Sequence, residues 1–201
     1  MLGRIKSERS DVANKQGGHP MDNGASSYRR YLNGDESGFH EIVKEYFDHL
    51  VFFIDRYVHD YGVAEDIAID VFTYLIVNKN RYNFHVSLKT YLFMIGRSRA
   101  LDYLRHHKKL TMVELTEASQ VSSSDPTPED IVLTDERKRA LNRALEQLSD
   151  EMRLAIHLVY FEDLSCEEAA KVLKKSRKQV YNLLYRGKST LRTILDKECA
   201  L

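Results

Sequence analysis

The fold of this chain is decided by residues 165–192, which read SCEEAAKVLKKSRKQVYNLLYRGKSTLR. This stretch holds two capping boxes, one formed by Ser165 with Glu168 and the other by Ser176 with Gln179. Each box satisfies backbone N–H groups in the first turn of a helix, so the chain marks two helix starts. A short helix, a break of two lysines and a longer helix together predict a helix-turn-helix.

The second helix of this motif is predicted to be cationic. Between Lys171 and Arg192 there are eight Lys and Arg and no Asp or Glu, although the whole chain has a formal net charge of zero. A cationic second helix suits the major groove of DNA, where Arg can bind guanine and Gln or Asn can bind adenine. The candidate DNA-contacting residues are Arg177, Lys178, Gln179, Tyr181, Asn182 and Arg186.

The rest of the chain has helical periodicity and no strand pattern. Apolar residues recur at three- and four-residue spacing over 39–54, over 64–77 after a break at Gly62, and over 87–107. Residues 119–128 are rich in Ser and contain two of the three prolines, which is typical of a linker. We therefore predict an all-α protein with two small helical domains joined by a flexible linker. The predicted boundaries are a flexible N-terminal tail over 1–27, a first domain over 28–108, a linker over 109–132 and a second domain over 133–201.

Several classes of protein are excluded by composition. No run approaches the roughly 20 apolar residues of a membrane span, and residues 1–27 lack the apolar segment of a secretory signal, so we expect a cytoplasmic protein without membrane insertion. Cys166 and Cys199 have neither disulfide-framework nor zinc-site spacing. No metal, cofactor, catalytic residue or small-molecule substrate is predicted.

Residues 79–86, KNRYNFHV, mix cations, amides and aromatic rings. This is the chemistry of a pocket for an unstacked base, on which an aromatic ring stacks while an amide reads the base edge. The candidates are Asn80, Tyr82, Asn83 and Phe84. An equally good interpretation of each aromatic residue is that it anchors the loop to the core.

A basic segment follows this loop. It has five Lys and Arg against one acid between residues 97 and 109. Arg97, Arg99 and Arg105 are predicted to contact phosphates, which position a nucleic-acid strand without reading its sequence.

The predicted helix over 64–77 carries an acidic edge. Asp66 and Asp70 are four residues apart and therefore share one face, next to Glu65. On spacing alone, a solvated face explains them better than a binding surface. A Mg²⁺ or Ca²⁺ site is poorer still, because no further oxygen ligands are nearby.

The order of these features resembles the sigma-70 family of bacterial RNA polymerase sigma factors, and in particular its extracytoplasmic-function (ECF) group. The resemblance is carried by five segments, namely GDESGF over 34–39, AEDIAIDVF over 64–72, YLFMIGRS over 91–98 with LDYLR over 101–105, LEQL over 145–148, and EDLS with EAA over 162–170. It covers roughly residues 31–197.

The resemblance implies a function and a set of partners. A member of this family is not an enzyme; it binds core RNA polymerase and promoter DNA, and an anti-sigma factor can sequester it. Glu65, Asp66 and Asp70 would then bind core polymerase. Tyr91, the loop over 79–86 and the helix over 87–107 would open and hold the −10 element, and the helix over 177–192 would read the −35 element.

This chain departs from the family pattern at specific positions. Ile69 stands where the family usually has Gln, Tyr91 where it usually has Trp, and Gly96 and Ser98 where it commonly has Ala and Asn. Lys174 stands in the turn of the helix-turn-helix, where the family often has Gly. A non-glycine residue in a left-handed conformation is uncommon, so this turn is expected to be strained or altered.

Two other functions remain open from the residues alone. A helix-turn-helix regulator that acts without polymerase would bind duplex DNA by itself. A nuclease built around Asp66 and Asp70 would need metal, and no third clustered ligand is present to complete its site.

Overall fold

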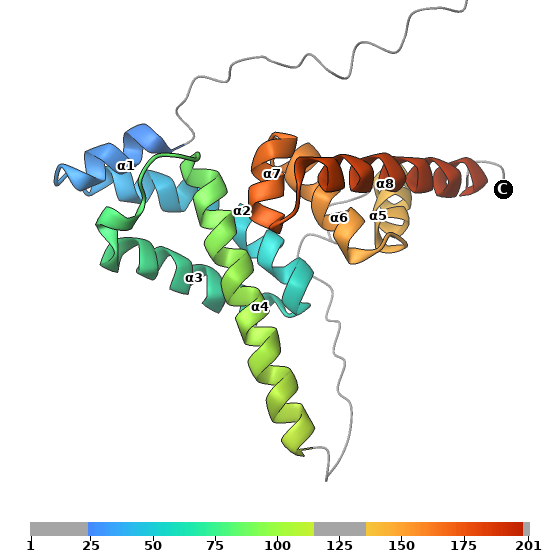
Figure 1. Ribbon diagram of the computed structural model, residues 1–201, viewed down its shortest axis with the longest axis horizontal. Coiled ribbons are helices and arrows are strands. Elements are labelled where there is room, and N and C mark those ends of the chain that lie inside the picture. The colour runs from blue at the N-terminus through green and yellow to red at the C-terminus, as the bar shows by residue number, and fades with distance from the viewer. Residues whose placement is uncertain (1–23, 115–135, 199–201) are drawn as a thin grey trace, which may run out of the picture.

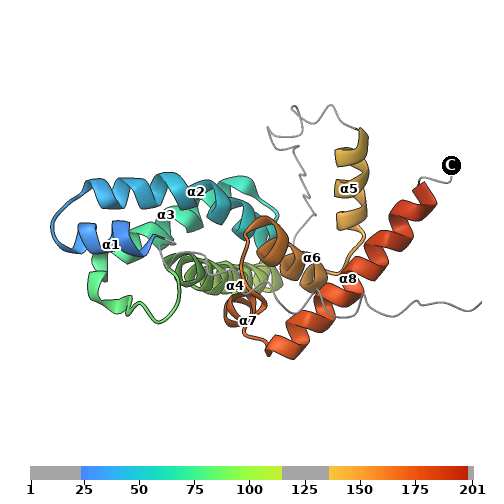
Figure 2. The same cartoon turned by 90° about the horizontal axis from the view of Figure 1, so that it is seen from above.

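The computed structural model describes residues 24–114 and 136–198, and every regular element in these ranges is helical. The helices form two groups that lie side by side (Figures 1 and 2). The first unit contains α1–α4 and the second unit contains α5–α8. The prediction of an all-α fold in two helical units is confirmed. None of the helices in the described ranges is long and apolar enough to cross a bilayer.

The first unit is built around α2 (Ser37–Val58), which α1 (Ala25–Leu32), α3 (Tyr61–Val77) and α4 (Leu88–Glu114) flank. Its core contains part of the apolar stripes that the periodicity predicted, and other stripe residues, such as Phe39 and Ile95, are half-buried. Ile42, Leu50 and Ile54 of α2 are fully buried. Burying one such side chain contributes about 1.5–3 kcal/mol, so the buried side chains of α2 make a large contribution to the stability of this unit.

The break between α2 and α3 lies earlier than predicted. His59 ends α2 in a left-handed conformation (φ 54°), and the Asp60 carboxylate accepts a hydrogen bond from the Val63 N–H at 3.0 Å. Asp60 therefore caps α3, and Gly62, which the sequence suggested as the break, lies inside its first turn.

Two predicted boundaries also change. Ala25–Ser27 form the first turn of α1, although the tail was predicted to run to residue 27. Helix α4 continues through 109–114, which the sequence assigned to the linker. The sequence has no Gly or Pro there to end the helix. The rest of the predicted tail and linker, residues 1–23 and 115–132, lies outside the described residues.

The second unit contains the predicted helix-turn-helix. Its elements are α5 (Glu136–Glu146), α6 (Asp150–Ile156), a π-helical turn η3 (His157–Phe161), α7 (Cys166–Leu173) and α8 (Arg177–Glu198). Both predicted capping boxes are present. The Ser165 Oγ accepts from the Glu168 N–H at 3.2 Å, and the Ser176 Oγ accepts from the Gln179 N–H at 3.2 Å.

Lys174 lies between α7 and α8 in a left-handed conformation (φ 52°, ψ 45°), so the turn is strained as expected rather than altered. We expect Lys174→Gly to raise the free energy of unfolding by about 0.5–1 kcal/mol, because glycine adopts this conformation without steric cost. Urea unfolding measures the change. Lys171→Gly, within α7, is the matched control. Its free energy of unfolding should fall by about 1 kcal/mol, because glycine is unfavourable inside a helix. A loss of stability in Lys174→Gly would contradict the left-handed turn.

Candidate functional site

The loop that follows α3 is organised by Tyr82. It begins with a short 3₁₀ helix, η1 (Lys79–Arg81), and its Tyr82 side chain is 4% exposed. The Tyr82 hydroxyl donates to the Val86 carbonyl oxygen at 2.7 Å, and its ring lies 5.3 Å from that of Tyr28 and 5.1 Å from that of Tyr91, between centroids. In this arrangement Tyr82 anchors the loop, which is the packing role that the sequence left open.

Phe84 occupies the outer part of the same loop. Its backbone is left-handed (φ 61°), which is unusual for a bulky residue, and its ring is half-buried against Tyr82. The Arg29 guanidinium lies 5.0 Å from the centroid of the Phe84 ring. Asn80 and Asn83 are exposed. The loop thus presents a cation, amides and one aromatic ring on an anchored scaffold.

The predicted phosphate-binding arginines of α4 face different surroundings. The Arg99 guanidinium lies 3.5 Å from the Asp70 carboxylate and 5.6 Å from the centroid of the Tyr74 ring. Arg105 is exposed and pairs with Asp102 at 2.7 Å. Arg97 is half-buried and lines a cavity between the two units. Only Arg105 is therefore open to solvent over most of its side chain in this arrangement.

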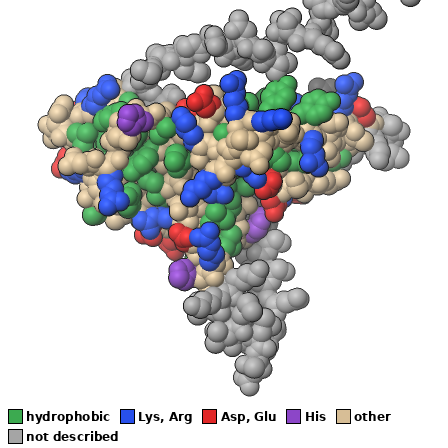
Figure 3. Space-filling model, viewed as in Figure 1, with side chains coloured by type: hydrophobic (Ala, Val, Ile, Leu, Met, Phe, Trp, Pro, Cys, Tyr) green, Lys and Arg blue, Asp and Glu red, His purple; other side chains and the backbone are tan. Residues whose placement is uncertain are grey.

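The helix-turn-helix presents all six predicted DNA-contacting residues to solvent. Val180 and Leu184 hold the opposite side of α8 in the core. Gln179 has a second role, because its Oε1 accepts from the Ser176 N–H at 2.7 Å. Tyr181 and Tyr185 are 54% and 70% exposed, and Figure 3 shows apolar side chains beside Lys and Arg over this part of the molecule. Exposed aromatic rings on a cationic helix suit a nucleic-acid surface.

Helix α3 has an outer face that the sequence predicted only in part. Asp66 and Asp70 are exposed there, and Glu65 is half-buried. Ile69 is 53% exposed and Val77 is 74% exposed on this helix. The signal for this mixed face was Ile69 itself, an apolar residue one position before Asp70.

A buried carboxylate joins the two units. Glu162, just after η3, is 3% exposed. The Lys89 ammonium of α4 lies 2.9 Å from its Oε2 and also donates to its carbonyl oxygen at 2.8 Å. His49 Nδ1 of α2 lies 3.1 Å from Glu162 Oε2, and His157 Nε2 lies 3.3 Å from its Oε1. No sequence pattern predicted this cluster, because its members are far apart in the chain.

The environment of Glu162 shifts its titration. Burial alone would raise the pKa of Glu162, but the contacts from His157 and Lys89 outweigh it and lower the pKa to about 2. Burial also lowers the pKa of His157 below its ordinary value of 6.5, so its ring is neutral at neutral pH. The buried ion pair is therefore formed by Glu162 and Lys89.

A second contact between the units uses the first capping box. Glu168 Oε1 accepts hydrogen bonds from the Ser87 hydroxyl at 3.0 Å and the Thr90 hydroxyl at 3.2 Å, both at the start of α4. Its Oε2 accepts from the Ser165 N–H at 3.0 Å. One carboxylate thus caps α7 and holds α7 against α4.

We expect the free energy of unfolding to fall as the pH drops below about 5. The pKa of Glu162 is about 2 in the folded chain and 4.5 ordinarily, so the unfolded chain takes up the proton first. The stabilisation is complete above the ordinary value and is lost towards pH 2, by up to about 3 kcal/mol. His157 adds a loss of the same sign below its ordinary pKa of 6.5. Urea unfolding at neutral pH and at about pH 3.5 measures this loss of unfolding free energy. In Glu162→Gln the free energy of unfolding should fall less between the two pH values. An equal loss in the wild type and in Glu162→Gln would contradict this role of Glu162.

Comparison with known proteins matches both units. The model of sigma-70 region 2 matches residues 42–110, and that of sigma-70 region 4 matches residues 138–191. The chain is 28% identical over 172 residues to the ECF RNA polymerase sigma factor SigW of Bacillus subtilis, covering 82% of this chain and 92% of SigW. It is 24% identical over 170 residues to the ECF RNA polymerase sigma-E factor of Escherichia coli, covering 81% and 88%.

Solved structures share the fold. The sigma factor RpoE of Bartonella quintana, in complex with the anti-sigma factor NepR, has a TM-score of 0.63 and 19% identity, with 79% of this chain and 96% of that chain covered. CnrH, in complex with the cytosolic domain of CnrY, has a TM-score of 0.60 and 19% identity, with 88% and 99% covered.

A region 2-type bundle followed by a region 4-type helix-turn-helix defines an RNA polymerase sigma factor. This chain belongs to the sigma-70 family, in its ECF group. The comparisons favour this over a helix-turn-helix regulator that acts without polymerase.

Proposed function

We propose that this sigma factor divides promoter recognition between its two units. The helix-turn-helix reads the −35 element, and the loop over 79–86 with α4 opens and holds the −10 element. The observation that carries this proposal is the presence of exposed, cation-rich surfaces on both units, α8 on one and the loop with Arg29 and Arg105 on the other. Two sites on one chain raise the effective concentration of the second after the first has bound.

The −35 element is read from the first turns of α8. Arg177, Lys178, Tyr181, Asn182 and Arg186 are exposed there. The amide nitrogen of Gln179 is the part of that side chain left for DNA, since its oxygen accepts from the Ser176 N–H. These groups supply guanine, adenine and phosphate contacts.

The −10 element is captured by the anchored loop. Phe84 is the ring that stacks on an extruded base, with Asn80 and Asn83 in the same loop, and the Tyr91 ring packs against that of Tyr82. Stacking of one base on an aromatic ring stabilises by about 1–3 kcal/mol. Arg99 and Arg105 exchange their acidic partners for phosphates, and Arg97 becomes available when the two units separate.

Core polymerase binds the outer face of α3. Asp66, Asp70 and Glu65 supply charge, and Ile69 supplies apolar area where most family members have Gln. An acidic rim around an exposed apolar residue fits a basic groove on another protein.

The first domain covers α1–α4, over 24–114, the linker covers 115–132 and the second domain covers 133–201. The chain has no enzymatic activity of its own. It acts in the cytoplasm, where its polymerase partner lies. Since RpoE and CnrH are each solved in complex with an anti-sigma factor or a partner domain, we propose that an anti-sigma protein also binds this chain.

The experiment that tests the function is in vitro transcription. Core RNA polymerase is run with and without the chain on fragmented genomic DNA, and the RNA 5′ ends are sequenced. New start sites with a shared two-part upstream motif are expected. If the chain fails to bind core polymerase and yet binds duplex DNA alone, the free-standing regulator replaces this proposal.

We expect Asp66→Arg to weaken binding to core polymerase by about tenfold or more, because a reversed charge faces a basic groove. Competition between labelled and unlabelled chain for core polymerase, in the absence of DNA, measures this. Glu45→Arg is the control, since Glu45 is an exposed acid on α2 outside this face. Equal weakening in both variants would indicate a general charge effect and not an α3 interface.

A further inference from the structure

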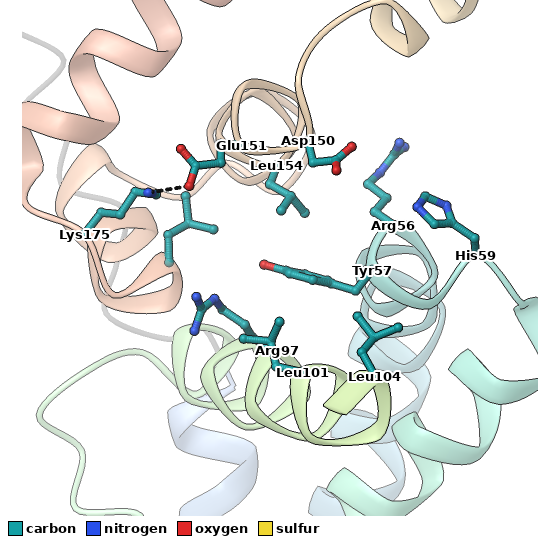
Figure 4. A pocket seen from close by; sticks show the side chains of 11 residues that line it. Arg56, Tyr57, His59, Arg97, Leu101, Leu104, Asp150, Glu151, Leu154 and Lys175 are labelled. Atoms are coloured by element: carbon teal, nitrogen blue, oxygen red, sulfur yellow. Dashed lines mark hydrogen bonds and ion pairs between the residues drawn. The ribbon is translucent and has the colours of Figure 1, made fainter. Parts of the chain in front are cut away.

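A cavity of about 290 Å³ lies between the two units of the chain (Figure 4). Helix α2 contributes Arg56 and Tyr57, α4 contributes Arg97, and α6 contributes Asp150 and Glu151. Because its walls come from both units, the cavity exists only where the two units pack together.

The cavity wall carries hydrogen-bond donors without acceptors. Arg56 Nε and Arg97 Nε are buried and have no hydrogen-bond partner; the buried Tyr57 hydroxyl lies beside the Arg97 guanidinium, and its proton has no acceptor. Figure 4 shows the Tyr57 hydroxyl pointing towards Arg97 across the space, with Arg56 on the other side of Tyr57. Arginine can only donate, and buried donors are normally satisfied, so this wall is built to face an acceptor.

The charge of the cavity is positive once existing pairs are removed. Asp150 pairs with Arg153 at 2.7 Å, and Glu151 pairs with Lys175 at 2.7 Å. Neither Arg56 nor Arg97 makes an ion pair of 4.0 Å or less with any residue in the described ranges. Two guanidinium groups are therefore left without a carboxylate.

The pKa shifts of Arg56 and Tyr57 agree with this imbalance of charge. Burial lowers the pKa of Arg56, and the neighbouring Arg153 lowers it further, against the opposing effect of Asp55 and Glu162. Burial raises the pKa of Tyr57 to about 12, against the opposing effect of the Arg97 charge and hydrogen bond, so its hydroxyl keeps its proton and can donate. An anion in the cavity would favour the charged form of Arg56 and accept from Tyr57.

We propose that this cavity binds an oxyanion, the phosphate or carboxylate group of a small molecule, through the Tyr57 hydroxyl and Arg97 Nε. Arg56, whose guanidinium lies beyond Tyr57 on the side of Asp150 and His59 (Figure 4), adds to the positive charge of the cavity without contacting the ligand. Charge-assisted hydrogen bonds from arginine to such a group are among the strong ones in proteins. The competing explanation, that ordered water fills this polar space, is an outcome of the test below.

The binding has a consequence for regulation, which rests on the proposed function. The groups that bind the ligand lie on α2 and α4 of the first unit, and α6 of the second unit closes the cavity over them. A ligand enclosed in this way favours the packed arrangement and shifts the population towards it. In that arrangement Arg97 lines the cavity instead of facing a DNA strand. The ligand would oppose promoter binding, whereas the binding itself requires neither polymerase nor DNA.

The test titrates inorganic phosphate into the whole chain at neutral pH and constant ionic strength, with binding followed by the ³¹P line width. Acetate is the second probe, added as a competitor, to separate a phosphate site from a carboxylate site. The variants are Tyr57→Phe, which removes one oxygen and keeps the ring, and Arg97→Gln. Lys44→Gln is the control, because it removes one positive charge from an exposed position of α2. Circular dichroism confirms that each variant is folded.

Saturable phosphate binding by the wild type and Lys44→Gln is expected, with at least a tenfold weaker affinity in Tyr57→Phe. If acetate competes with phosphate, the site also accepts carboxylates. If acetate does not compete, the site is specific for phosphates. Both outcomes support the proposal. No saturable binding, or equal binding by all four chains, would overturn it in favour of water or an adventitious ion only. Since polymerase is absent, this result is independent of whether the chain initiates transcription.

Discussion

Gly38→Ala is expected to lower the free energy of unfolding by about 3 kcal/mol, the upper end of the usual cost of overpacking. A Cβ atom on Gly38 would overlap the Ser27 carbonyl oxygen of α1 and lie 3.1 Å from the Tyr31 backbone nitrogen. Both obstacles are backbone atoms, so no side-chain rotation relieves them, and α1 must move away from α2.

Movement of α1 would also disturb the loop that we propose to capture the −10 element. Tyr28 of α1 is fully buried, and its hydroxyl donates to the Lys79 carbonyl oxygen at 2.8 Å. Its ring also packs edge-to-face on Tyr82. Gly38→Ala should therefore reduce promoter opening by more than it reduces binding of core polymerase.

Urea unfolding with linear extrapolation measures the stability change. Gly62→Ala is the matched control, because the nearest atom to its added Cβ would be Asp60 Oδ1 at an ordinary 3.5 Å. Alanine is the better helix former, so this control should gain about 0.5–1 kcal/mol. If Gly38→Ala lay within about 0.5 kcal/mol of the wild type, α1 and α2 would not cross as closely as described.

Much of the fold could be predicted from local pattern. The helix predicted over 64–77 is Tyr61–Val77, and the capping boxes at Ser165 and Ser176 begin α7 and α8. These features depend on residues three or four positions apart, which periodicity and capping describe directly. The error at Gly62 has the same origin, since the preference of Asp60 for the N-cap was overlooked in favour of a glycine.

Other features could not be predicted because they depend on distant residues. Helix α1 is short, and what holds it is the packing of Tyr28 and Tyr31 on residues of the loop and of α2. The burial of Tyr82, the cavity position of Arg97 and the Glu162 cluster all require that parts far apart in sequence meet in space. The candidate DNA surface of α8 was predictable because it needs only one amphipathic helix.

Lys89→Met is the second prediction with a large effect, and it concerns the contact between the two units. We expect a loss of about 3 kcal/mol, the usual cost of removing one partner from a buried ion pair. Glu162 would keep its carboxylate in a site that is 3% exposed, with His49 and His157 left beside it, and its carbonyl oxygen would lose the Lys89 hydrogen bond.

The double variant Lys89→Met with Glu162→Met separates the ion pair from the packing around it. Replacing both partners of a buried pair by apolar residues is often neutral, so the double variant should be more stable than Lys89→Met alone. The same chains are measured by urea unfolding and by small-angle X-ray scattering, which reports whether the units separate. A larger radius of gyration is expected for Lys89→Met than for the wild type. If Lys89→Met has the same free energy of unfolding and the same radius of gyration as the wild type, the Lys89–Glu162 pair does not hold the units together. The Glu168 contacts with Ser87 and Thr90 would then be the contacts that do so.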